Sequence, residues 1–455
     1  MSESRFTEAL ARFVAAHDPL SLPGPVRVSA RQAMADCMGC ALAGVGDPAA
    51  EIVRKAALDE PGGCTVWGTA LRATARNAAL VNGTAAHALA LDDTNESMRG
   101  HPSAPIVPAV FAVGEEIDAS GESLVAAYAV GVEVAAKLGR AVNDTHSERG
   151  WHTTMTLGTV GAACAVAHLL KLDVIETRHA IGIAATMAGG IRANFGTMTK
   201  ALGPGLAAQN GILAARLAGR GFTANPEALE AHEGFMALFG KADHSRLRGI
   251  LEALASPFEL DRPGLVFKTY PNCSLLHTTI DMLLDGVEAG ALDPANIRKL
   301  RIAISPRLER MRVKGRPVAP LQAKFSVEYA AACALVRGSV SAADFTDDAL
   351  EDAALDEMMS RITVTVGAGF GEDNGDLAEV SVERRDGSTW FRRLAKPRGH
   401  ITNPLPEEAL RTKFIQNARG IWRQEQALAA WDALMRIETM GCRAISAVFR
   451  APVSS

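Results

Sequence analysis

From the start of the chain to about Asp261, alanine and leucine recur every three or four residues, and Gly, Pro and Asp divide this pattern into helix-length pieces. Such spacing places apolar side chains along one face of an α-helix, and alanine has the highest helix propensity. Several pieces, such as SLVAAYAVGVEVAAKLGRAV, are apolar on almost every side, which is typical of a helix surrounded by other helices. The sequence therefore predicts an all-helical domain over residues 1–262.

A second pattern begins near the stretch SPFELDRPGLVFKTYPNCS, where prolines flank a short apolar run. Three kinds of β-type segment follow: IRKLRIAISPRLERMRV, then SRITVTVG, then the pair LAEVSVERR and STWFRRLA. Asp386-Gly387 joins that pair, and Asp-Gly between alternating strands is a strong hairpin signal. With the helical segment KFSVEYAAACALVRG between them, these residues predict an α+β domain over 263–395. Residues 396–455 are again helical in pattern, so the tail is expected to return to the helical domain.

The composition is that of a globular protein of two domains. The 455 residues are 48% hydrophobic and 22% charged, and the formal net charge of -4 argues against general binding to nucleic acid or to anionic membranes. No uncharged apolar run approaches the roughly 18 to 20 residues of a membrane span, and the first residues lack a signal-peptide pattern. The seven cysteines, odd in number and dispersed, suit a reducing compartment. We therefore expect a cytoplasmic protein.

Four segments concentrate polar side chains against an apolar, glycine-rich background. They are ALALDDTNESMRGHPSAP with Asp92, Asp93, Thr94, Arg99, His101 and Ser103; RGWHTTMTLGTVGAACAV with His152; ANFGTMTKALGPGLAAQNG with Thr199 and Lys200; and GLVFKTYPNCSLLHTTID with Lys268, Tyr270, Cys273 and His277.

These residue types suit the binding of an organic acid and the transfer of protons. Arginine binds a carboxylate through two parallel hydrogen bonds, imidazole titrates near neutral pH, and a lysine held at a helix N-terminus attracts an anion. Each segment also has a simpler interpretation: a solvated loop after a helix, an ordinary histidine at a helix start, a surface lysine, or a structural connector. Both interpretations stay open on the residues alone.

Other chemistries find little support in the chain. There is no G-x-S-x-G elbow, Walker loop or dinucleotide fingerprint, and the histidines lack H-E-x-x-H spacing, so no metal is predicted. A three-cysteine iron-sulfur site would need Cys37, Cys40 and Cys64, of which the first two are interpreted as helix core. The remaining histidines, His87 among them, are interpreted as surface or satisfied core residues.

The four segments, in this order, resemble the MmgE/PrpD family, which includes 2-methylcitrate dehydratase, cis-aconitate decarboxylase and iminodisuccinate epimerase. The likeness covers almost the whole chain and rests on VNGTAAHALALDDT, HPSAPIVPAV, WHTTMTLGTVGAA, GTMTKALGPGLAAQNG, FKTYPNCSLLHTTID and KFSVEYAAACAL. It implies a mainly α fold, with a large helical domain built from both ends of the chain and an inserted, smaller α+β lid-like domain. It also implies a homodimer and a site between the domains that uses neither cofactor nor metal.

The resemblance also assigns site residues, and it shows three departures. The family's functional positions fall on Asp92, Asp93, Thr94, His101, His152, Lys200 and Lys268. The chain has Ala90 where members commonly have aspartate, Cys273 where the decarboxylases have histidine, and Gly203 where many members have a second histidine after the lysine. These departures argue against cis-aconitate decarboxylation and weaken the case for methylcitrate dehydration.

The resulting hypothesis is a lyase that dehydrates or decarboxylates a small di- or tricarboxylate. Arg99, Lys200 and Lys268 would bind the carboxylates, and His101 and His152 would move protons. Asp93 would orient a histidine or act as a second base, and Thr94 would hold a substrate oxygen. Asp92, Ser103, Thr199 and Tyr270 complete the predicted substrate-binding site. Two alternatives are an epimerase of an amino- or imino-dicarboxylate and a non-catalytic carboxylate-binding member.

Overall fold

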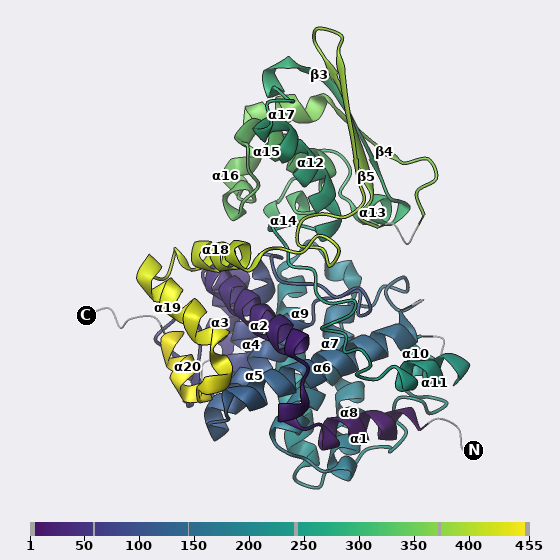
Figure 1. Ribbon diagram of the computed structural model, residues 1–455, viewed down its shortest axis with the longest axis vertical. Coiled ribbons are helices and arrows are strands. Elements are labelled where there is room, and N and C mark those ends of the chain that lie inside the picture. Colours follow the sequence, from purple (N-terminus) through teal and green to yellow (C-terminus); the bar gives the residue numbers. More distant parts are fainter. Residues whose placement is uncertain (1–4, 58–59, 144, 241–243, 372–374, 451–455) are drawn as a thin grey trace. The chain divides into compact units, whose positions relative to one another are not determined.

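The computed structural model describes residues 5–57, 60–143, 145–240, 244–371 and 375–450, and it forms two compact units (Figure 1). Unit 1 comprises Met1–Val266 and Pro406–Ser455, and unit 2 comprises Phe267–Leu405. The fold is mainly α with an α+β second unit, as the sequence predicted.

The chain passes from unit 1 to unit 2 after Val266 and returns to unit 1 at Pro406. The boundaries predicted from the sequence lie after residues 262 and 395. Val266 is held in unit 1 by two backbone hydrogen bonds with Thr94, of 2.9 and 2.8 Å. The loop after the last strand stays in unit 2, because the Phe267 N–H donates to the Gly399 carbonyl at 2.9 Å and the Arg398 N–H donates to Asp281 at 2.7 Å. Neither contact has a local sequence signature.

Unit 1 is a bundle of helices. Its helices are α1 (Phe6–Ala16), α2 (Gly24–Gly44), α3 (Pro48–Ala57), α4 (Ala75–Ala88), α5 (Ser103–Ile117), α6 (Gly121–Val142), α7 (Thr153–Leu169), α8 (Val174–Met187), α9 (Met198–Ala218), α10 (Phe235–Phe239), α11 (His244–Glu252), α18 (Glu407–Ala418), α19 (Gln424–Met435) and α20 (Cys442–Val448). Helix α6 is apolar on almost every side, and nearly all of its residues are buried. The expectation of an entirely helical region was wrong in one detail: Cys64–Thr65 (β1) and Arg72–Ala73 (β2) form a short antiparallel pair.

Helices α4 and α9 approach each other closely enough to bring their polar ends together. A Cβ at Gly83 would lie 2.9 Å from the Gly205 Cα, and a Cβ at Gly205 would lie 2.3 Å from the Leu80 carbonyl oxygen. Only glycine fits such a contact between helix backbones. The crossing places the end of α4 beside the beginning of α9, where Lys200 lies.

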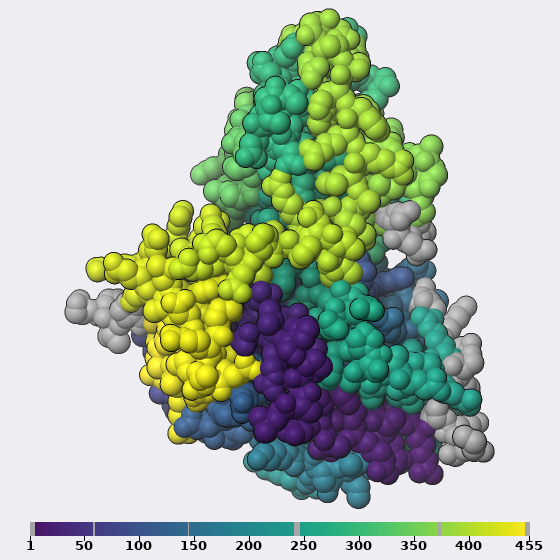
Figure 2. Space-filling model, viewed as in Figure 1, coloured from purple at the N-terminus to yellow at the C-terminus, as the bar shows by residue number. Residues whose placement is uncertain are grey.

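The C-terminal helices pack on the N-terminal part of unit 1. In Figure 1, α18 lies beside α2, and in Figure 2 the C-terminal and N-terminal surfaces meet. Glu438 forms salt bridges of 2.6 Å with Arg27 and 2.5 Å with Arg31. Because these residues lie at opposite ends of the chain, the tail completes the bundle that the first residues begin.

Unit 2 is a four-stranded sheet with helices. Its elements are α12 (His277–Glu288), β3 (Ile297–Ile304), α13 (Pro306–Met311), α14 (Pro320–Ala323), α15 (Val327–Arg337), α16 (Asp347–Leu350), α17 (Ala353–Ser360), β4 (Ile362–Val366), β5 (Ala378–Arg384) and β6 (Thr389–Leu394). The strand order is β4-β3-β5-β6, with β3 and β4 parallel and the other pairs antiparallel. The predicted Asp-Gly hairpin joins β5 to β6, and Gly387 has a φ of 84°.

One predicted β-type segment changes structure within its length. IRKLRIAI is β3, but PRLERM is the short helix α13, which Ser305 caps by accepting from the Leu308 N–H. Pro306 at the first helical position favours that ending of the strand. Among the described helices, none combines the length and the hydropathy that a bilayer crossing requires.

Candidate active site

Three side chains, the buried Asp92 and His87 and the partly buried Lys200, form a hydrogen-bonded line at the α4–α9 crossing. The His87 Nδ1 lies 3.0 and 2.9 Å from the two Asp92 carboxylate oxygens. On the opposite edge of the ring, the His87 Nε2 lies 2.7 Å from the Lys200 Nζ. Since a lysine ammonium only donates, the neutral imidazole must carry its hydrogen on Nδ1 and accept at Nε2. The line therefore runs from the ammonium through the imidazole to the carboxylate.

Two further histidines adjoin this line. The His101 Nδ1 lies 3.0 Å from the Asp92 Oδ2, and the His101 ring meets the His87 ring edge-on at 4.5 Å between centroids. The His152 ring lies 6.1 Å from that of His87. Phe195 contacts both the His152 ring, at 5.1 Å, and the Lys200 ammonium, at 5.7 Å. The structure thus brings His101, His152 and Lys200 together, although they are far apart in sequence.

The start of α7 fixes the loop that carries His101. The Thr153 hydroxyl donates to the Arg99 carbonyl at 2.7 Å, and the Thr154 hydroxyl accepts from the His101 N–H at 3.1 Å. His152 immediately precedes these threonines as the N-cap residue of α7. The repeated threonines of WHTTMT therefore hold the two histidines near each other.

Gly203 bears on the position of His152. A Cβ at residue 203 would lie 3.1 Å from the His152 Nδ1 and 3.2 Å from its Cε1. A glycine therefore allows the His152 ring to lie close against α9, where a larger residue would require the ring to move.

The charges of the cluster follow from burial and from its neighbours. Burial is the main cause that lowers the pKa of His87 to about 3, which Asp92 opposes and Lys200 reinforces. Burial also lowers the pKa of His152 well below its ordinary value. Burial alone would raise the pKa of Asp92, but His101 and His87 lower it well below its usual range. The cluster therefore holds an ionised carboxylate between imidazoles, of which His87 and His152 are neutral at pH 7.

The neighbouring aspartate, Asp93, has different partners. Its carboxylate accepts from the Ser103 hydroxyl at 2.5 Å, and the Ser103 and Tyr128 hydroxyls lie 2.6 Å apart. All three side chains are buried. Burial, with the charges of Asp36 and Asp92, raises the pKa of Asp93 well above its usual value. The carboxylate that contacts the histidines is thus that of Asp92. The Asp93 carboxylate instead contacts the buried Ser103 hydroxyl of the helical core.

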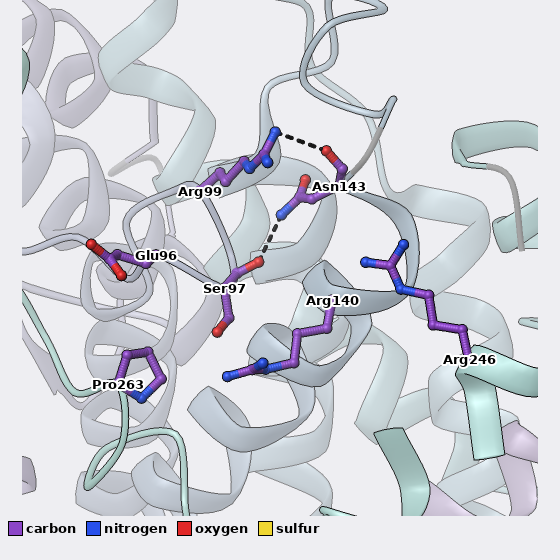
Figure 3. A pocket seen from close by; sticks show the side chains of 7 residues that line it. All are labelled: Glu96, Ser97, Arg99, Arg140, Asn143, Arg246 and Pro263. Carbon is purple, nitrogen blue, oxygen red and sulfur yellow. Dashed lines mark hydrogen bonds between the residues drawn. The ribbon is translucent and has the colours of Figure 1, made fainter. Parts of the chain in front are cut away.

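Arg99 is directed elsewhere. Its guanidinium donates to the Asn143 carbonyl at 3.0 Å, and Arg99 lines an open pocket of about 270 Å³ with Glu96, Ser97, Arg140, Asn143, Arg246 and Pro263 (Figure 3). Within the described part of the chain, no hydrogen bond or ion pair joins the Arg99 side chain to the histidines. The structure therefore does not bring this arginine to the cluster.

The remaining predicted residues have these places. Thr94 is partly buried and pairs with Val266 through its backbone, while Thr199 is exposed in the first turn of α9. Lys268 and Tyr270 are buried residues of unit 2, where the Tyr270 hydroxyl donates to Asp281 at 2.7 Å. Substrate binding by these four residues stays a prediction.

His87 is a buried core histidine with a partner on each ring nitrogen, which is one of the two interpretations drawn from the sequence, but its place in the cluster was not predicted. Its side chain is fully buried between Asp92 and Lys200, at the centre of the cluster. One sequence signal pointed to it: it is the only imidazole in an alanine-rich helix that ends four residues before Asp92. Its contact with Lys200 depends on the helix crossing and has no signal in the sequence.

His87, Asp92 and His101 each place one metal-ligand atom within 4.8 Å of the others. The His87 Nδ1 is hydrogen-bonded to the Asp92 carboxylate, and the His101 Nδ1 lies 3.0 Å from the same carboxylate.

Acid should destabilise the fold through its buried histidines. The pKa values of His87 and His146, lowered by burial to about 3 and about 4, lie below the ordinary 6.5. These groups are neutral in the fold and bind protons in the unfolded chain, so stability is fully present above pH 6.5 and is lost as the pH falls from 6.5 towards 4. Urea unfolding at several pH values measures this loss. In His146→Gln the slope should decrease by up to about 1.4 kcal/mol per pH unit, the effect of one proton. Stability that rises on acidification would contradict the assignment.

Comparison with known proteins identifies the family. Residues 8–247 match the MmgE/PrpD N-terminal domain, and residues 270–437 match the MmgE/PrpD C-terminal domain. The cis-aconitate decarboxylase of Homo sapiens is 30% identical over 388 residues, which cover 81% of this chain and 77% of the relative. The cis-aconitate decarboxylase-like protein oryM of Aspergillus oryzae is 27% identical, covering 96% and 95% of the two chains. The cis-aconitate decarboxylase of Mus musculus is 27% identical, covering 85% and 81%. Together these matches confirm the resemblance read from the sequence, and the chain belongs to the MmgE/PrpD family.

Proposed function

We propose that the protein is a cofactor-independent lyase that decarboxylates a small unsaturated tricarboxylate. The observation that carries the proposal is the cluster itself, in which His87 and His101 adjoin an ionised Asp92 while Lys200 and His152 lie next to His87. Such a set supplies a positive charge and several proton carriers within one small region. The names of the relatives support decarboxylation as the reaction.

Decarboxylation requires both a positive charge and a proton donor. When the bond between a carbon and its carboxylate breaks, carbon dioxide leaves and the electron pair stays on the substrate. That pair forms a new double bond, and the former double bond takes up a proton at its far carbon. The Lys200 ammonium would stabilise the negative charge during this shift, because a cation in a site of low polarity acts more strongly than in water. The group that gives its proton regains one from water.

His101 is the best candidate for the proton donor. Its Nδ1 faces Asp92, so its Nε2 would exchange the proton with the substrate. Its side chain is 13% exposed, whereas that of His87 is fully buried, so a substrate can reach it more easily. Asp92 would then orient the His101 ring and stabilise its charged form. His87, which contacts both Lys200 and Asp92, would hold these two side chains in place relative to each other.

Lysine 268 and Tyr270 would bind a second carboxylate, as the family resemblance implies. We also propose a homodimer, which the resemblance implies, and a cytoplasmic location, which the dispersed cysteines favour. Analytical ultracentrifugation of the purified protein measures the first of these.

A panel of polycarboxylates tests the proposal. The departures at Ala90, Cys273 and Gly203 are reasons to include citrate-like, methyl-substituted and amino-dicarboxylate acids beside cis-aconitate. We expect the wild-type protein to release carbon dioxide from at least one unsaturated tricarboxylate, and His101→Ala to be at least about 100-fold slower, the lower range for loss of a general acid. Binding without turnover of any acid would instead favour a carboxylate-binding protein.

A further inference from the structure

A buried ion pair lies next to the turn that carries Asp92. The Lys413 Nζ of α18 lies 2.5 Å from the Asp36 Oδ1 of α2, and it donates to the Leu91 carbonyl at 2.9 Å. The two charged side chains are only 10% and 3% exposed. Leu91 directly precedes Asp92, so the lysine contacts the backbone next to the carboxylate that faces both histidines.

The turn itself is strained. Ala90 has a φ of 57°, in the left-handed region that costs a residue with a Cβ roughly 1–2 kcal/mol. A strained turn persists only where its surroundings hold it in place. The Ala90 N–H donates to the His87 carbonyl at 3.1 Å, and Lys413 holds the following carbonyl. Together these contacts set the direction of the chain into Asp92.

Stability alone is a poor reason for the ion pair. Replacing a buried ion pair by apolar residues is often neutral or stabilising, because both charges lose their hydration. The Lys413 pair therefore needs another explanation, and its hydrogen bond to the Leu91 carbonyl supplies one.

We propose that Lys413 is a positioning residue: by holding the Leu91 carbonyl from the C-terminal helix α18, it keeps the Asp92 carboxylate between His87 and His101. The kinetic consequences rest on the proposed function, whereas the structural consequence does not. The C-terminal segment thereby contributes to the site although none of its residues needs to touch the substrate.

Three variants separate positioning from stability. In Lys413→Met we expect kcat to fall about 10–100-fold while KM stays within about 3-fold of the wild type. Losses of this size follow mutation of residues that orient metal ligands through hydrogen bonds without touching the metal themselves. This variant leaves the Asp36 charge buried without its lysine, so it should also lower Tm. Asp36→Asn/Lys413→Met removes both charges and should regain much of Tm, but kcat should stay low because the Leu91 carbonyl still lacks its donor. Lys413→Arg, which keeps a donor and the charge, should recover part of kcat.

A double variant that regains wild-type kcat together with Tm would overturn the proposal, because Lys413 would then act through stability alone. The imidazole ¹⁵N resonances of His87, assigned with His87→Gln, provide a readout that needs no turnover. We expect the hydrogen on Nδ1 in the wild type and a mixture of tautomers in the double variant. Identical ¹⁵N shifts in the two proteins would also overturn it. If the shifts differ while the wild type turns over none of the acids tested, positioning stands and the proposed function fails.

Discussion

Asp92→Asn should lower kcat by about 10³-fold or more while the protein stays folded. The wild-type carboxylate accepts from His87 through both oxygens and also lies 3.0 Å from the His101 Nδ1. An amide carries no charge and replaces one accepting oxygen by a donating NH2 group, so it holds the His87 Nδ1–H and the His101 ring less firmly. The His87 hydrogen would then be free to move to Nε2, where it would oppose the donating Lys200 ammonium. Loss of the correct imidazole tautomer costs rates of this size in other enzymes with histidine–aspartate pairs.

The matched control is Asp432→Asn, which makes the same change at an exposed position of α19. We expect its kcat to equal that of the wild type. Circular dichroism and thermal unfolding show whether each variant is folded. A folded Asp92→Asn protein with kcat within about 3-fold of the wild type would show that the carboxylate does not orient the histidines during the reaction.

Lys200→Met should lower kcat by about 10²- to 10³-fold, the range expected for loss of one group that stabilises negative charge in the transition state. Methionine keeps the length of the side chain but neither donates to the His87 Nε2 nor supplies charge. Because the Lys200 charge lowers the pKa of His87, that pKa should rise above about 3 in the variant. The pH dependence of kcat measures the first effect, and histidine NMR titration the second.

Lys200→Arg distinguishes charge from proton transfer. A guanidinium keeps the charge but does not give up its proton near neutral pH. Because the proposed role of Lys200 is that of a charge, we expect Lys200→Arg to keep KM within about 3-fold of the wild type and to have a kcat at least about 10-fold above that of Lys200→Met. Lys55→Met, at an exposed lysine of α3, is the control for removal of a lysine charge. If Lys200→Arg were as slow as Lys200→Met, Lys200 would transfer a proton and would not act as a charge alone.

The sequence predicted those features that local chemistry determines. Alanine periodicity located the helices, Asp386-Gly387 located the hairpin, and three of the four polar segments contain residues of the cluster. What it missed depends on contacts between distant residues. The contact of His87 with Lys200 needs the Gly83–Gly205 helix crossing. The hydrogen bond from Lys413 to the Leu91 carbonyl joins residues that are far apart in the sequence.

Neighbouring residues were also hard to tell apart from the sequence. Asp92 and Asp93 are adjacent in a turn, yet one carboxylate faces two histidines and the other faces Ser103 and the packed interior. The left-handed backbone at Ala90 precedes the two aspartates and sets the direction of the chain into them, and an alanine does not predict that conformation. Arg99 also has a left-handed backbone, with a φ of 48°, and its guanidinium donates to the Asn143 carbonyl.

Proton NMR and carbon NMR of a single reaction test the central claim, that this cluster moves a proton onto carbon as carbon dioxide leaves. The wild-type protein is incubated in deuterium oxide with cis-aconitate labelled with ¹³C at its carboxyl groups, or with the tricarboxylate that the panel selects. We predict release of labelled carbon dioxide and one solvent deuterium on carbon in each product molecule, with both signals lost in His101→Ala. Deuterium entering an acid that keeps all its carboxyl groups would contradict the account and identify an epimerase.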